Sequence, residues 1–322
     1  MTRARELQSR NAAAKSIASH NLRNRRPQRK DILEKQKRIR QLDEAILHGD
    51  VATLQRLSVT GAGFVNDGIR RRAWPLLLRT IKGRHKEEFE DDKPSKDEEQ
   101  VRLDVLRSFT HLASDPNVRE AVRRKRQDEL SEVIIDVLKR HPRLSYYQGF
   151  HDVCTCLITV LGKESATLAA ECMALVFFRD CMLDNLEPVL DQLSLMMGIF
   201  RLEDPEVLEF LNRSDTLPFF ALSWVITWCS HDLQDFEKVA RVYDFFLCSN
   251  PLMPVYFAAA VVMSRREELF EQECDNAMVH TFLTKFPKNC DLELIISHAH
   301  QLFETYPPET LQKRTQTWLD DK

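Results

Sequence analysis

The clearest hydrophobic pattern in the chain is a helical stripe that stops at a proline. Apolar residues recur every three or four positions between Asp128 and Arg140, which predicts an amphipathic helix. The apolar positions are Leu130, Val133, Ile134, Val137 and Leu138. His141-Pro142 ends this helix, because the residue before a proline avoids the α region and proline donates no backbone hydrogen bond. Residues 150–161 are apolar enough to form a buried helix directly afterwards.

A short polar turn, Tyr146-Tyr147-Gln148-Gly149, lies between these two predicted helices. A glutamine amide both donates and accepts hydrogen bonds, so Gln148 could orient an attacking water molecule without being ionised. The alternative is an ordinary capping turn whose glutamine satisfies backbone groups at the helix ends.

A second informative helix is predicted over residues 97–112, where Val101, Val105, Phe109 and Leu112 form one apolar stripe. At 100° per residue, Arg107 lies about 160° from the centre of that stripe, with Asp104 about 60° from Arg107. We therefore expect Arg107 to face solvent beside a carboxylate. Such pairs are common and usually of little consequence, but an exposed, pre-positioned arginine is also what phosphoryl-transfer activation requires.

Period-3.6 patterns continue through the rest of the chain and, with only 8 glycines, predict an all-α fold. Further helices are expected over 165–180, 187–201, 205–213, 218–230, 235–248, 253–270, 276–284, 291–305 and 308–319. We read 1–30 as a basic disordered arm and 31–59 as a helical preface in which Asp50 caps the second helix. Residues 307–322 would form a C-terminal helix and tail.

Three local features add expectations about packing. Asp67 is a candidate N-cap for a helix that carries Trp74 on its apolar face. On spacing alone, the simplest interpretation of Arg70 is a surface salt bridge of little energetic value. Arg241 and Asp244 stand in apolar surroundings and are expected to form a buried ion pair. The apolar stripe Phe219, Phe220, Trp224 and Trp228 is expected to be core.

Charge is distributed unevenly. Residues 1–40 hold 13 Lys/Arg against 3 Asp/Glu, a net of +10, which leaves −13 for the rest of a chain whose total is −3. A basic arm on an acidic body could contact anionic membrane, or could be a solvated tail. Arginines there are not interleaved with aromatic residues, so nucleic-acid binding is not expected. No apolar run reaches the roughly 18 residues that a membrane span requires.

Signatures of a self-contained enzyme are missing from the sequence. It has neither a G-x-x-x-x-G-K-[ST] nor a G-x-G-x-x-G phosphate loop, and no nucleophile elbow. His151, Cys154 and Cys156 do not complete a metal-ligand set, so core packing is preferred over a metal site. The 8 cysteines show no paired CxxC modules and are read as reduced core residues.

Four stretches, in order, resemble the successive motifs of the TBC-domain Rab GTPase-activating proteins. They are Arg70-x-x-Ala73-Trp74, Val101-x-x-Asp104-x-x-Arg107, Tyr146-x-Gln148-Gly149 and Arg241-x-Tyr243-Asp244. The resemblance covers about residues 60–306. The sequences of three later stretches, residues 221–224, 243–247 and 251–259, are most similar to the endoplasmic-reticulum-anchored branch. Val101 and Ala73 depart from the usual isoleucine and valine. That branch carries a C-terminal transmembrane segment, which these 322 residues do not contain.

The resemblance implies a two-lobed helical domain over residues 60–306 with a groove that receives a Rab protein. It implies that Arg107 is an arginine finger and Gln148 a glutamine finger, both supplied in trans. Asp104, Tyr146 and Gly149 would support the fingers, and Arg70 with Trp74 would support the fold around them.

The function expected on this basis is acceleration of GTP hydrolysis by a Rab, in membrane traffic between endoplasmic reticulum and Golgi. The chain would be an activator rather than a stand-alone enzyme, with no cofactor of its own, since GTP and Mg²⁺ belong to the Rab. We expect a cytoplasmic location, with peripheral contact to anionic membranes of the endoplasmic reticulum or Golgi as a further expectation. The rival hypothesis is a non-catalytic Rab-binding scaffold with the same fold.

Overall fold

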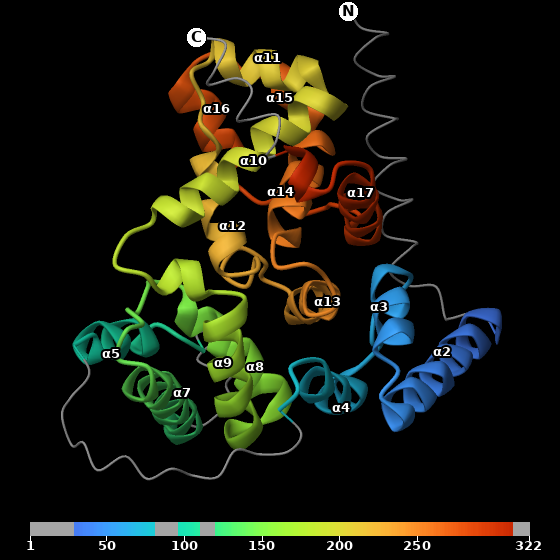
Figure 1. The fold of residues 1–322 in the computed structure, drawn as a ribbon, viewed down its shortest axis with the longest axis vertical. Coiled ribbons are helices and arrows are strands. Elements are labelled where there is room, and N and C mark those ends of the chain that lie inside the picture. Colours follow the sequence, from blue (N-terminus) through green and yellow to red (C-terminus); the bar gives the residue numbers. More distant parts are fainter. Residues whose placement is uncertain (1–28, 81–95, 110–119, 312–322) are drawn as a thin grey trace, which may run out of the picture.

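The computed structural model describes residues 29–80, 96–109 and 120–311, and every regular element in these ranges is a helix. This confirms the all-α class. Figure 1 shows two groups of helices, one above the other, with α12 and α13 between them. The arm predicted for 1–30 lies almost wholly outside the described residues. Residues 308–311 are helical, and the rest of the predicted 308–319 helix also lies outside them.

The first lobe is built around α8 (Phe150–Leu161), which is the buried helix expected there. It packs against α4 (Asp67–Leu77), α5 (Glu98–Leu106), α7 (Glu120–Arg140) and α9 (Lys163–Val176), and η1 (Arg179–Met182) follows. The stripe that predicted α7 is buried at all five positions. Because α8 is apolar on most of its circumference, its neighbours must cover it from several sides.

The second lobe is built around α14 (Met253–Met263), whose residues 253–262 are all buried. It packs against α17 (Leu292–Thr305), α10 (Glu187–Glu203) and α12 (Leu222–Ile226). The remaining elements are α11 (Pro205–Arg213), η2 (Pro218–Ala221), α13 (Phe236–Phe246), α15 (Arg266–Phe270) and α16 (Asn276–Leu283). The helices predicted over 218–230 and 253–270 are therefore each divided in two.

The junction between α4 and α13 contains a buried carboxylate, Asp244, which is 0% exposed. Arg70 Nε donates to both of its oxygens at 3.2 Å, Trp74 Nε1 donates at 2.9 Å, and the Phe64 backbone N–H donates at 3.0 Å. The surface salt bridge that local spacing suggested for Arg70 is not found, because this side chain is 2% exposed. Its partner stands 174 residues away in the sequence, so local pattern could not reveal it.

The predicted ion pair between Arg241 and Asp244 does not form, because each residue has another partner. Arg241 instead forms a two-pronged ion pair with Glu293 of α17, with both N–O distances at 2.8 Å, and donates to the Gly61 carbonyl. Gly63, with φ +52, lies so close that an added Cβ would meet Asp244 Oδ2 at 2.8 Å. These contacts hold the 60–66 segment against α13.

Helix α2 (Arg29–His48) and helix α3 (Val51–Val59) form the preface, and Asp50 caps α3 by accepting from the Thr53 N–H, as expected. Two smaller expectations fail. The N-cap of α4 is Asn66, and Asp67 instead pairs with Arg70. Phe219 is 45% exposed, although the other members of its stripe are buried. Cys274 is exposed too, so the core reading of the cysteines does not extend to it.

Candidate functional site

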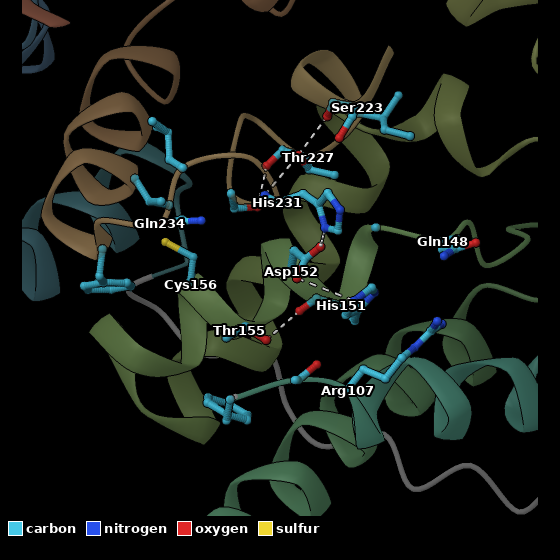
Figure 2. Close-up of a pocket in the computed structure, with 18 of the residues that line it drawn as sticks. Arg107, Gln148, His151, Asp152, Thr155, Cys156, Ser223, Thr227, His231 and Gln234 are labelled. Atoms are coloured by element: carbon cyan, nitrogen blue, oxygen red, sulfur yellow. Dashed lines mark hydrogen bonds and ion pairs between the residues drawn. The ribbon is translucent and has the colours of Figure 1, made fainter. Parts of the chain in front are cut away.

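Arg107 and Gln148, the two candidate fingers, line a groove of about 1080 Å³ between the first lobe and the α12–α13 segment. Figure 2 shows Arg107, Gln148 and His231 as part of its lining. The walls come from the end of α5, the turn before α8, helix α12, and the loop that joins α12 to α13. The groove is thus formed by segments far apart in sequence that the two lobes bring together.

Arg107 is presented at the end of a helix rather than on its side. The predicted 97–112 helix ends at Leu106, with Arg107 as C-cap, and Phe109 adopts φ +57. Val101, Val105 and Phe109 are buried as the stripe predicted, whereas Leu112 lies outside the described residues. The Arg107 side chain is 64% exposed, as its helical position predicted. Most of its guanidinium is therefore accessible from the groove.

Asp104 is the group that holds Arg107. It was expected on the solvated face, but its side chain is 0% exposed. Arg107 Nη2 and Gln100 Nε2 donate to Oδ1, the latter at 3.2 Å, and the Tyr146 hydroxyl donates to Oδ2 at 2.8 Å. A buried carboxylate requires such donors, because an unpaired charge away from water is costly. Asp104 consequently fixes Arg107 and the Tyr146 turn relative to each other.

The turn that carries Gln148 is anchored on both sides of it. The Tyr146 backbone N–H donates to Asp97 Oδ2 at 2.8 Å, and the Tyr147 hydroxyl donates to the Ile226 carbonyl at 2.7 Å. Gly149 has φ +123, and a Cβ there would meet Thr227 Cγ2 at 2.9 Å. Gln148 itself is exposed and lines the groove. The backbone is thus held firmly while the amide remains accessible.

A chain of polar contacts runs from this turn along the groove, from Tyr146 through His151 to Asp152. The Tyr146 hydroxyl lies 3.1 Å from His151 Nδ1, and His151 Nε2 lies 3.5 Å from Asp152. Since the tyrosine hydroxyl donates its hydrogen bond to Asp104, its oxygen can accept one from the imidazole. Burial lowers the pKa of His151 below its ordinary value, so the neutral ring is favoured. Burial also raises the pKa of Tyr146, so the neutral hydroxyl is favoured. Both groups act as neutral hydrogen-bonding links near pH 7.

The structure brings together most of the predicted site. Arg107, Gln148 and Gly149 line the groove, and Asp104 with Tyr146 lies directly behind it. Arg70 and Trp74 lie elsewhere, at the Asp244 junction, where they stabilise the contact between α4 and α13.

Two groove residues were missed by the sequence reasoning: Asp152, whose Oδ2 lies 2.9 Å from His231 Nδ1, and His231 itself. The available signal was a polar Ser-His-Asp triplet at 230–232 that directly follows an apolar run. His151, Cys154 and Cys156 are all buried, which confirms the core reading, although His151 and Cys156 also touch the groove.

Comparison with known proteins defines the class. The Rab-GTPase-TBC domain model matches residues 67–270, which is more than half of the chain. The chain belongs to the Rab-GTPase-TBC domain family. It is 38% identical over 271 residues to proteins named TBC1 domain family member 20 from Bos taurus and Homo sapiens, covering 82% of this chain and 66% of each of them. The match thus spans less than two thirds of those proteins.

Other relatives agree with this assignment. GTPase-activating protein gyp10 of Schizosaccharomyces pombe is 33% identical over 288 residues, covering 86% of this chain and 76% of that protein. Among solved structures, the Ypt/Rab-GAP domain of Gyp1p superimposes with a TM-score of 0.61 at 19% identity, covering 80% of this chain and 93% of that one. A Chlamydomonas flagellar RabGAP TBC domain gives 0.52 at 11% identity, covering 92% of each chain. These likenesses show the TBC fold.

Proposed function

We propose that this chain is a GTPase-activating protein for a Rab-family small GTPase, and that it supplies Arg107 and Gln148 to the nucleotide site of its partner. The observation that carries the proposal is the buried carboxylate of Asp104, which binds Arg107 directly and the Gln148 turn through Tyr146. One group thereby sets the spacing of two exposed side chains in a single groove. Family membership and the relatives named as GTPase-activating proteins support the same conclusion.

Arg107 would stabilise charge that develops in the transition state. Phosphoryl transfer spreads negative charge over the oxygens of the γ-phosphate and the leaving group, and a planar guanidinium can bridge two such oxygens. Asp104 restricts the side chain before the partner arrives, so less conformational entropy is lost on binding. The arginine thus acts as a pre-organised donor.

Gln148 would orient the attacking water. Its carbonyl oxygen can accept from the water and its amide can donate to it, while the glutamine stays neutral. Because Tyr147 and Gly149 fix the backbone on either side, the amide can be placed reproducibly. GTP and Mg²⁺ belong to the partner in this proposal, and the chain has no cofactor of its own. It is an activator that completes a partner's active site rather than an enzyme acting alone.

The test is hydrolysis of GTP by a panel of purified Rabs, each with and without the chain. Stimulation of at least one Rab at substoichiometric chain concentration supports the proposal. A Rab that binds the chain while its hydrolysis rate stays at the intrinsic value would instead support the scaffold alternative.

We further propose that the chain acts in traffic between endoplasmic reticulum and Golgi, in peripheral contact with anionic membrane. Within the described residues, no helix combines the length and apolar character needed to cross a bilayer. The net charge of +10 over residues 1–40 favours an anionic surface, and residues 31–37 of α2 are all exposed. Flotation with anionic liposomes tests the contact. Binding should weaken at high salt and on deletion of residues 1–28, and binding that survives both would contradict it.

A further inference from the structure

The loop between α12 and α13 is held in a strained conformation at the edge of the groove. Trp228 and Cys229 adopt φ values of +50 and +62, and both are buried. Left-handed conformations cost non-glycine residues roughly 1 kcal/mol or more each, so the surrounding structure must enforce them. The next two residues, Ser230 and His231, are thereby turned toward the groove that contains Arg107.

The His231 side chain is fixed although it is exposed. Its Nδ1 lies 2.9 Å from Asp152 Oδ2 of α8, and its backbone N–H donates to Thr227 Oγ1 at 3.4 Å. The side chain is nevertheless 63% exposed, so burial of apolar surface explains little of its position. Figure 2 shows Asp152 and His231 pointing toward each other at the groove lined by Gln148. The pair holds Nδ1, and among the described residues Nε2 has no hydrogen-bond partner.

The charges around this ring favour its protonated form. The hydrogen bond to Asp152 raises the pKa of His231 above its ordinary value of 6.5, and Asp232 on the same loop adds to the rise. His151, the other ring beside Asp152 on α8, has a lowered pKa and so competes little as a cation. On α12, Ser223 is neutral and donates to Asp232. The loop between α12 and α13 therefore presents at the groove a histidine ring whose protonated form is favoured.

We propose that His231 is a third partner-binding residue of the groove, donating from Nε2 to an acidic side chain on the surface of the GTPase. This inference rests on the proposed function. A carboxylate is favoured over the nucleotide phosphates because Arg107 and Gln148, on the first-lobe wall of the groove, are assigned to the nucleotide, whereas His231 belongs to the wall formed by the α12–α13 segment. An exposed cation of this kind contributes to binding and specificity more than to transition-state stabilisation.

The experiment measures kcat and KM for a Rab that the wild-type chain stimulates. His231→Ala should raise KM for that Rab by about tenfold while kcat stays within about twofold, since a charged hydrogen bond is worth this much in binding. His48→Ala is the matched control, because His48 is exposed at the end of α2 and far along the chain from the groove. Melting temperatures of both variants should match wild type within a few degrees.

The pH profile separates a binding role from a structural one. A raised pKa means that the imidazolium is fully present below about 6.5 and is lost as pH rises through the raised value. The ratio of KM for His231→Ala to KM for wild type should therefore be largest near pH ~6 and shrink toward 1 by pH ~8.5. Asp152→Asn should move this decline to lower pH. Taking a ratio cancels the titration of the Rab itself.

Three outcomes would overturn the inference: an unchanged KM for His231→Ala, a fall in kcat without a change in KM, or a KM ratio that does not vary with pH. The second outcome would indicate contact with the nucleotide phosphates. Each of these leaves the stimulation by wild type intact. If instead no Rab responds to the wild-type chain, it is the proposed function that fails.

Discussion

The Tyr146 hydroxyl donates a hydrogen bond to Asp104 Oδ2 at 2.8 Å, across 42 residues of sequence, in a site where the carboxylate is fully buried. This bond joins the end of α5 to the turn before α8. Because Arg107 is held by the other oxygen of the same carboxylate, the bond couples the position of the arginine to the position of the turn that carries Gln148.

Replacement of Arg107 should abolish stimulation without unfolding the chain. Arg107→Ala is expected to lower the stimulated rate by about 10³ to 10⁵, the range that an arginine finger gives in the Ras system. Arg107→Lys retains a cation for Asp104 but cannot bridge two phosphate oxygens, so it should recover only a small part. Single-turnover GTP hydrolysis measures both. Arg102→Ala, on the exposed face of the same helix, is the control and should stimulate as wild type does.

Removal of the Tyr146 hydroxyl tests the coupling itself. Tyr146→Phe is expected to lower the free energy of unfolding by about 1–3 kcal/mol, because a buried carboxylate loses a donor. Stimulation should fall more than the small change in folded fraction explains, since Arg107 and the turn are no longer held together. Tyr306→Phe removes a hydroxyl–carboxylate bond at the surface, to Glu203, outside the lining of the groove. Equal losses of stimulation in the two variants would contradict the positioning role.

Gly149 offers a test of the turn geometry with an internal control. Gly149→Ala places a methyl group 2.9 Å from Thr227 Cγ2 at φ +123, so it should cost both backbone strain and a clash. Gly162→Ala also falls at positive φ, +76, but has nothing within 4 Å, so it reports strain of about 1–2 kcal/mol without the clash. Chemical denaturation should show a larger loss for Gly149→Ala. Only that variant should also reduce stimulation.

The Asp244 junction should dominate stability and leave the groove chemistry untouched. Asp244→Asn removes the buried counter-charge of Arg70, which then keeps only the more exposed carboxylates of Asp67 and Glu237 as ionic partners. The variant is expected to destabilise the protein by about 3–5 kcal/mol. Arg72→Ala, which removes a half-exposed pair with Asp43, should cost less than about 1 kcal/mol. Urea unfolding of both variants measures the difference. Comparable losses would show that burial of the Arg70 pair carries no special weight.

Much of the fold followed from local pattern, because a helix is specified by neighbours three and four residues apart. The stripe at 130–138 identified α7, and residues 150–161 formed the expected α8. The exposure of Arg107 followed from its angle to the stripe. The end of α5 at Leu106 could not be predicted in this way, because the backbone turns at Phe109, where φ is positive.

The failures share a physical cause, which is that burial of a polar side chain depends on residues distant in sequence. Asp104 was expected at the surface, and Tyr146 covers it from another element. Local spacing alone suggested a weak surface salt bridge for Arg70, whereas its buried partner Asp244 comes from α13. His231 carried no periodic signal at all. In each case the sequence shows which residue is present, but its role depends on partners that only the tertiary fold brings close.

The role of Gln148 is tested with a responsive Rab whose own switch glutamine has been replaced by alanine, so that this Rab no longer positions its own water. If Gln148 is supplied in trans, GTP hydrolysis by this Rab should still be stimulated strongly by the wild-type chain and should stay at the intrinsic rate with Gln148→Ala. If the Gln148→Ala chain stimulates this Rab as strongly as the wild-type chain does, Gln148 does not orient the attacking water.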